Sequence, residues 1–156
     1  MTERGSASAG AEVAINAAPD TVYQLITDLD TLASLAEENE AMSWRKGGKP
    51  SPGAVFRGTN RNGSHKWTTT CTVTDAEPGR AFAFDVKYMA LPIAHWRYDI
   101  VPDGAGCRVT EQTWDRRPGW FSKTAWIGTG VRDRVGANAE HIKLTLQRLK
   151  ARAEGG

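Results

Sequence analysis

Glu111 is the residue whose type and position most directly suggest chemistry. It lies in a stretch from 107 to 116 whose alternation predicts a strand, and the apolar Val109 assigns the inward face of that strand to Glu111 and Thr113 as well. A carboxylate on an inward face is unfavourable unless it is paired. Its partner could be Arg57, Arg134 or a hydrogen-bond donor of a ligand. Glu111 is therefore a candidate acid/base or hydrogen-bond anchor. The alternative is a rim residue that reaches solvent.

The histidines and cysteines suggest less chemistry. His141 lies in a helical stretch, where a packed or exposed histidine is more common than a catalytic one. His65 and His95 fall on the outer faces of their strands, so we expect no metal site. Cys71 and Cys107 lie in strand-like runs, where buried free thiols are expected rather than a disulfide. The sequence contains no nucleophile elbow, phosphate loop or dinucleotide fingerprint, and no cofactor is expected.

One long amphipathic helix is predicted from 131 to 153. Its apolar residues recur at steps of three or four: Val131, Val135, Ala139, Ile142, Leu146, Leu149 and Ala153. Because no other stretch predicts a helix of comparable length, this one must bury its apolar side against a sheet. Asn138 and His141 lie beside the apolar residues, and Gly136 interrupts the bulky ones. We therefore expect this part of the helix to face a space as well as a packed core.

The rest of the chain predicts a sheet and two short helices. Strand patterns occur at 12–17, 42–45, 54–60, 65–76, 80–88, 94–101 and 107–116, and the helices, from Pro19 and at 31–38, follow the first strand. Short turns make consecutive strands antiparallel. Pro92 cannot occupy a central strand, so an interruption is expected at 89–94. The predicted fold class is α+β, with a seven-stranded curved antiparallel sheet wrapped around the long C-terminal helix and two short helices after strand 1.

Strand parity places many aromatic and a few polar side chains on the inner face. The candidate ligand-binding residues are Trp44, Phe56, Asn60, Trp67, Thr69, Phe82, Phe84, Trp96, Tyr98, Thr113, Asn138 and His141. Aromatic walls with a few polar groups are typical of a small-molecule cavity. The alternative is that the aromatic rings fill one another's space as an ordinary core. For the whole set, we favour a cavity.

Composition indicates one ordinary globular domain of 156 residues. Residues 1–10 are small and polar and predict a disordered tail, and residues 11–154 form the domain. A net charge of +2 with scattered basic residues does not favour nucleic acid as a partner. No stretch is apolar enough for stable membrane insertion, and without an export signal the cytoplasm is expected. The protein is expected to be a monomer or a homodimer.

Several segments resemble the START-like superfamily, also called SRPBCC or Bet v 1-like, in its polyketide cyclase/dehydrase and lipid transport branch. They are VAINAAPDTVYQLITDL at 13–29, FRGTN at 56–60, WTTTCTVTDAEPGR at 67–80, WRYDIVPDG at 96–104 and RVTEQTWDRR at 108–117, with the terminal helix. The resemblance covers about residues 11–153. It implies the helix-grip fold and a cavity for an apolar or aromatic small molecule.

Three functions are compatible with these observations. The first is a module that binds a hydrophobic or aromatic small molecule, lipid- or polyketide-like, between the sheet and the C-terminal helix. The second is a polyketide cyclase or dehydratase in which Glu111 moves protons while Tyr98, Asn138 and His141 donate to an enolate oxygen. The third is a protein-interaction module, which the polar outer face does not favour. The loops at 46–53 and 89–94 are expected to gate entry to the cavity.

Overall fold

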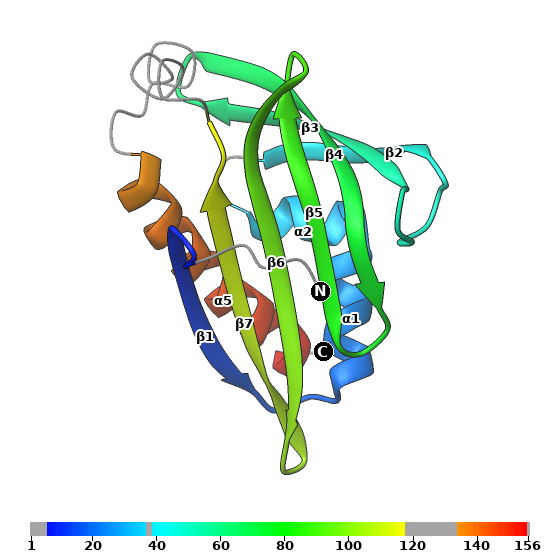
Figure 1. The fold of residues 1–156 in the computed structure, drawn as a ribbon. Coiled ribbons are helices and arrows are strands. Elements are labelled where there is room, and N and C mark those ends of the chain that lie inside the picture. Colours follow the sequence, from blue (N-terminus) through cyan, green and yellow to red (C-terminus); the bar gives the residue numbers. More distant parts are fainter. Residues whose placement is uncertain (1–5, 37–38, 118–133, 156) are drawn as a thin grey trace.

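The computed structural model describes residues 6–36, 39–117 and 134–155 (Figure 1). Its elements in chain order are β1 (Ala9–Ile15), α1 (Pro19–Thr27), α2 (Leu29–Leu35), β2 (Asn39–Lys46), β3 (Val55–Asn62), β4 (His65–Glu77), β5 (Ala81–Tyr88), β6 (Leu91–Asp103), β7 (Gly106–Asp115) and α5 (Arg134–Gly155). The seven strands form one sheet in the order β1-β7-β6-β5-β4-β3-β2, and every neighbouring pair is antiparallel. The predicted helix-grip fold is confirmed.

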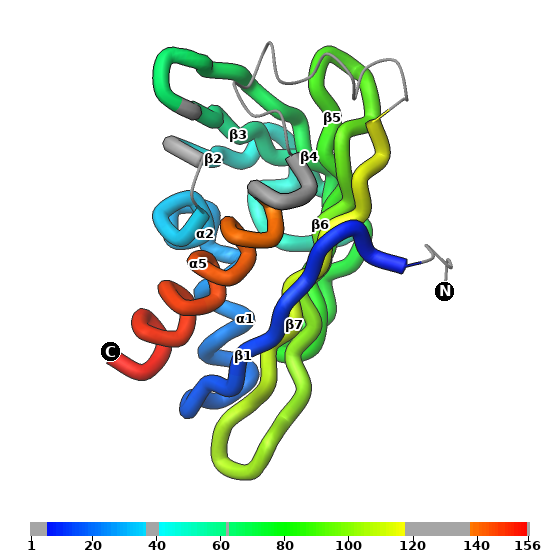
Figure 2. The backbone as a smooth tube through the Cα atoms, turned by 90° about the vertical axis from the view of Figure 1, so that its left-hand side faces the viewer, coloured from blue at the N-terminus to red at the C-terminus, as the bar shows by residue number. Residues whose placement is uncertain are grey.

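The molecule has two layers, a curved sheet and three helices on its concave side (Figures 1 and 2). Helix α5 packs mainly on β1, also touches β7, and contacts α1 and α2 at its flank. Its buried side chains Ile142, Leu146 and Leu149 continue the apolar spacing that predicted the helix. The first three residues of the predicted helix, 131–133, lie outside the described residues.

The C-terminal half of α5 is fastened to the rest of the chain by polar contacts. The Lys150 ammonium donates to the carbonyl of Ala14 at 2.9 Å, and the Glu154 carboxylate accepts from the Asn16 backbone N–H at 2.7 Å. Arg148 donates to the carbonyl of Leu35 at 3.1 Å, where α2 ends and its last carbonyls lack helical partners. These bonds fix the end of α5 against β1 and α2.

The first short helix meets the turn between β4 and β5. Gly79 in that turn has φ of +73°, and a side chain there would collide with Asp20 in the first turn of α1. The charge of Glu77 in the same turn helps to raise the pKa of Tyr23 on α1, although burial raises it more. The first turn of α1 and the Glu-Pro-Gly-Arg turn therefore lie against one another, which gives these two segments a structural role.

Several boundaries differ from the prediction. Helix α2 runs over Leu29–Leu35 rather than 31–38. Strand β1 begins at Ala9, two residues inside the stretch expected to be a disordered tail. Strand β2 runs over 39–46 rather than 42–45. Strand β6 begins at Leu91, because Met89 and Ala90 form a two-residue turn with φ of 50° and 69° and the strand resumes at once. The expected interruption at 89–94 is thus confined to this turn and to a register shift beside Pro92.

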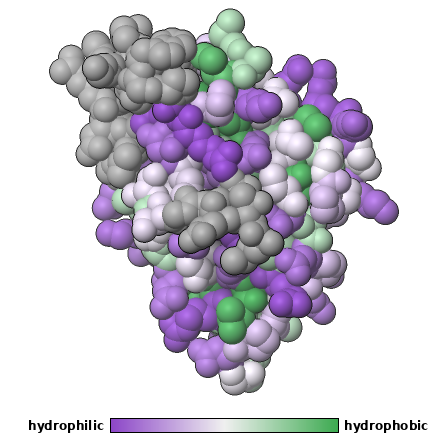
Figure 3. Space-filling model, in the orientation of Figure 1, coloured by the Kyte–Doolittle hydropathy of each residue, from purple (hydrophilic) through white to green (hydrophobic). Residues whose placement is uncertain are grey.

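The outer face of the sheet is mainly hydrophilic (Figure 3). Among the described residues the exposed large hydrophobic side chains are Met89 and Val101, which belong to separate positions on the β5–β6 turn and late β6. A contiguous apolar patch of the kind that marks a protein interface is therefore not formed by the described residues. None of the described helices is both long enough and apolar enough to span a membrane.

Candidate functional site

Glu111 lies deep on the inner face of the sheet. Strand β7 runs between β1 and β6, so its inward residue Glu111 has Ala11 on one side and Tyr98 on the other. Glu111 is only 3% exposed, which excludes the solvent-reaching rim position. The Tyr98 hydroxyl donates a hydrogen bond to the carboxyl group. The oxygen Oε1 has no hydrogen-bond partner among the described residues.

Burial controls the protonation of this carboxyl group. Removal from water raises the pKa of Glu111 to about 8, and the hydrogen bond from Tyr98 opposes that shift. Burial, with the nearby Glu111, also raises the pKa of Tyr98 well above its usual value. At neutral pH the pair is therefore mostly an uncharged carboxylic acid beside an uncharged phenol.

The two cationic partners considered from the sequence do not appear at Glu111 in the described structure. Arg57 is exposed and alternates with the buried Phe56, so it belongs to the outer face of β3. The side chain of Arg134 lies outside the described residues.

Four of the predicted aromatic residues form a packed chain across the inner face. The Trp44 ring lies 5.6 Å from Phe56, which lies 5.1 Å from Phe84, and both pairs are edge-to-face. Phe82 continues the chain at 5.5 Å from Phe84. Phe56 and Phe82 have no exposed surface. These two rings are part of the core, and the half-buried Trp44 is the ring of this chain that a ligand could contact.

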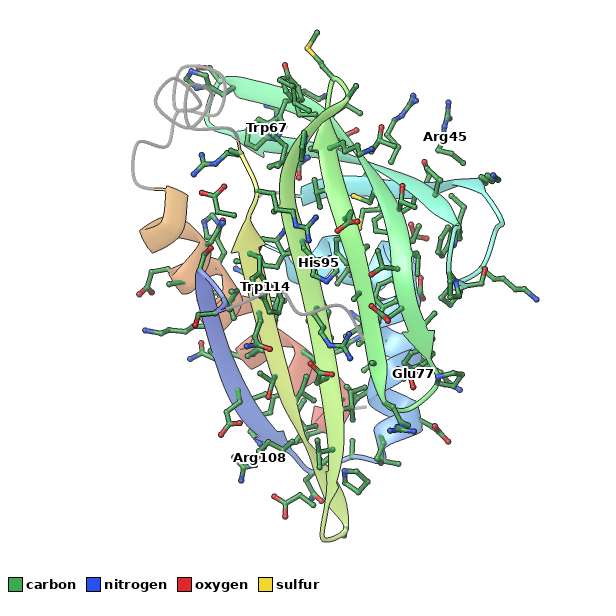
Figure 4. The ribbon with its side chains drawn as sticks, viewed as in Figure 1. Arg45, Trp67, Glu77, His95, Arg108 and Trp114 are labelled. Carbon is green, nitrogen blue, oxygen red and sulfur yellow. The ribbon has the colours of Figure 1, made fainter. Side chains whose placement is uncertain are left out.

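The tryptophans on the inner face are less enclosed than the residues that follow them. Trp67 near the start of β4, Trp96 near the middle of β6 and Trp44 on β2 are all half-buried. Further along β4, the inward residues Cys71 and Val73 are 4% and 1% exposed. Along β4, the inner face is thus more accessible where the strand begins, at Trp67, and more enclosed toward Val73. Trp67 is labelled at this more accessible end in Figure 4.

The predicted polar residues fall into two groups. Asn60 donates to the Thr69 hydroxyl at 3.2 Å across β3 and β4, beside Trp67. Thr113 on β7 pairs with Trp96 and donates to the carbonyl of His95 at 3.2 Å. The polar side chains of both groups are buried and form hydrogen bonds within the protein.

Asn138 and His141 are both half-buried on α5. They lie on the helix that covers the inner face at β1 and β7. The structure therefore joins Glu111 with Tyr98 directly, and places Asn138 and His141 on the covering helix.

A buried histidine on the outer face is a feature that the sequence did not suggest. His95 does lie on the outer side, as its parity predicted, but it has no exposed surface. Its Nδ1 atom lies 2.7 Å from Oδ1 of Asp85 on β5, and its ring centroid lies 5.5 Å from that of Trp114 on β7. Figure 4 labels His95 and Trp114 on these neighbouring strands. Asp85 is the residue that pairs with His95 on the neighbouring strand. This pairing could be recognised only once the register of the two strands was known.

The cysteines are free and buried, as predicted. Burial raises the pKa of the Cys71 thiol to about 12, which makes it a poor nucleophile. Within the part of the chain that the structure describes, no group of three or more His, Cys, Asp or Glu could hold a metal ion. The β5–β6 turn lies at the top of Figure 1, and the β2–β3 connection projects to one side. Whether these two segments gate entry stays a prediction.

Comparisons with known proteins agree with this architecture. The family described as polyketide cyclase / dehydrase and lipid transport matches residues 6–154. A polyketide cyclase-like protein, Cgl2372 from Corynebacterium glutamicum, is 23% identical over 97% of this chain and 94% of its own, with a TM-score of 0.64. Ara h 8.0201 is 8% identical over 94% of this chain and 97% of its own, with a TM-score of 0.69.

A third structure is the di-domain ARO/CYC StfQ from the steffimycin biosynthetic pathway. It is 14% identical over 94% of this chain and 50% of its own, with a TM-score of 0.72. At these identities the three structures support the fold alone. The search of curated proteins found no match. Because the family match spans nearly all of the described fold, the chain belongs to the polyketide cyclase / dehydrase and lipid transport family.

Proposed function

We propose that the protein binds a hydrophobic or aromatic small molecule between the inner face of the sheet and α5. The observation that carries this proposal is the partial exposure of three inward-facing tryptophans, Trp44, Trp67 and Trp96. An indole that points toward the centre of a small domain is normally well enclosed, because its burial is strongly favourable. Three of them left half-buried on one face support a surface that a ligand can cover.

The gradient of enclosure supports the same site. Inward residues become steadily less exposed along β4, from Trp67 through Thr69 at 8% to Val73 at 1%. A ligand entering at the start of β4 would meet indole surface first and the Glu111–Tyr98 pair farther in, on β6 and β7. An apolar wall with one polar group at depth is a usual arrangement for a small-molecule site.

The test is binding of aromatic polyketides and fatty acids, measured by thermal shift and by native mass spectrometry of protein purified from its own host. Replacing Trp67 on the inner face by Leu should weaken binding. The matched change Trp114→Leu, on the outward parity of β7, should leave affinity unchanged. The proposal is wrong if no compound of either class binds, or if both substitutions weaken binding equally.

A second candidate function is that of a polyketide cyclase or dehydratase. The observation that favours it is the buried carboxyl of Glu111, whose raised pKa of about 8 lets it give and take a proton near neutral pH. Glu111 would be the acid/base, and Asn138 and His141 would donate to an enolate oxygen. The single O–H of Tyr98, expected from the sequence to do the same, donates to Glu111 instead. If the protein converts a poly-β-keto substrate and Glu111→Gln retains the full rate, this role is refuted.

A further inference from the structure

Among the described residues, no charged side chain balances the carboxyl group of Glu111. Tyr98 on β6 is the titratable side chain that acts on it, and β1 presents Ala11 beside it. Along β7 its inward neighbours are Val109 and Thr113, which carry no charge. A buried carboxylate without a cation is strongly disfavoured and takes up a proton instead.

Helix α5, which packs on β1 and β7, adds no buried charge from its described residues. Its buried side chains are Ile142, Thr145, Leu146 and Leu149. The titratable residue His141 is half-buried and lies beside the apolar side of the helix. The exposed Glu140 and Lys143 form an ion pair with one another. The surroundings of Glu111 therefore favour the uncharged acid from the sheet side and from the helix side.

An uncharged Glu111 presents a hydrogen-bond donor. Tyr98 already donates to the carboxyl group, and Oε1 is left without a partner among the described residues. A protonated carboxyl has one O–H donor. Because Tyr98 already donates to one oxygen of the carboxyl group, the O–H on the other oxygen needs a hydrogen-bond acceptor. A buried O–H left without an acceptor costs free energy.

We infer that Glu111, held by Tyr98, is a hydrogen-bond-donating anchor that selects an uncharged aromatic ligand bearing a carbonyl or phenolic oxygen. This rests on the proposed binding function and goes further by specifying the ligand class. Direct contact of a carboxylate ligand such as a fatty acid with Glu111 is disfavoured, because the described residues offer no cation to balance a buried charge there. A ketone or phenol offers an acceptor without a charge.

The test compares three naphthalene probes that differ in one group. They are 2-acetylnaphthalene, 2-isopropenylnaphthalene, in which a CH2 group replaces the carbonyl oxygen, and 2-naphthoate, which is anionic. Their dissociation constants are measured by calorimetry at pH 6 and pH 9 with the wild-type protein, Glu111→Gln and Glu111→Leu. Because burial raises the pKa of Tyr98 well above its usual value, the phenol stays protonated at both pH values.

The wild type should bind the ketone about tenfold more tightly than its alkene isostere at pH 6. It should lose that preference at pH 9, where Glu111 ionises and can no longer donate. Glu111→Gln, whose amide donates at every pH, should keep the preference at pH 9, and Glu111→Leu should lack it at both values.

Two results overturn the ligand class while leaving the binding function intact. One is equal binding of ketone and alkene by the wild type at pH 6, and the other is tightest binding of 2-naphthoate. If none of the probes binds, the binding function and the ligand class both fall.

Discussion

The raised pKa of Glu111 makes a quantitative prediction about stability. The folded protein holds the proton of Glu111 with a pKa of about 8, whereas an ordinary glutamate loses it near 4.5. Since the folded state binds this proton more tightly, the stability it confers is fully present below pH 4.5 and is lost as the pH rises through 8. From pH 5 to pH 8, linkage gives a loss of about 3 kcal/mol in the free energy of unfolding.

The perturbation that isolates this effect is Glu111→Gln. Glutamine keeps the size of the side chain and an oxygen that can accept from Tyr98, but it cannot ionise. Relative to the wild type, the variant should therefore become more stable by about 3 kcal/mol between pH 5 and pH 8, because only the wild type must take up a proton or bury a charge when it folds. The other titrating groups are common to both proteins and cancel in the comparison.

The assay is urea denaturation of both proteins at pH 5, 6, 7 and 8, followed by circular dichroism. Glu140→Gln is the matched control, because it removes an exposed carboxylate from α5, and its stability should follow the wild type at each pH. Parallel stability curves for the wild type and Glu111→Gln would refute the buried, unpaired state of this carboxyl group.

Three further predictions concern the fold. Gly79→Ala should lower the free energy of unfolding, measured in urea, by about 2 kcal/mol, because the new side chain is strained at positive φ and displaces the Asp20 side chain of α1. Gly104→Ala, at φ of 62° in open space, should cost about 1 kcal/mol from strain alone. Equal costs for the two variants would contradict the contact with Asp20. Replacing Met89 by Asn together with Ala90 by Gly should raise the melting temperature, because these residues suit two positive φ angles; a lower one would contradict it. Glu154→Gln should destabilise the protein at pH 7 in thermal melts, because hydrogen bonds from the Asn16 N–H and from Lys150 lower the pKa of the Glu154 carboxylate. The difference in melting temperature from the wild type should vanish as the pH falls through that pKa. A difference that persists in acid would refute these charged hydrogen bonds.

Alternation and helical spacing were sufficient to predict the architecture. The buried residues Phe56, Val73 and Val109 lie on the faces that strand parity assigned to them. Ile142 and Leu149 are buried on α5 as the spacing of apolar residues required. These features follow from local periodicity, which each segment carries by itself.

The parts that could not be predicted depend on register and on packing across the sheet. Parity placed Glu111 and Tyr98 on the inner face, but only their pairing on β6 and β7 shows that one donates to the other. His95 alternates as an outer residue should, and its complete burial depends on side chains from distant segments. Likewise, sequence could not distinguish Phe82, which fills the core, from the half-buried Trp67.

The central claim is that a small aromatic molecule binds against the inner face of the sheet. The most direct test is an NMR titration with 2-acetylnaphthalene that follows the indole N–H signals, assigned by single tryptophan substitutions. The account predicts shifts for Trp44, Trp67 and Trp96 on the inner face, with little change at Trp114. Unchanged indole signals throughout the titration, or shifts confined to Trp114, would contradict it.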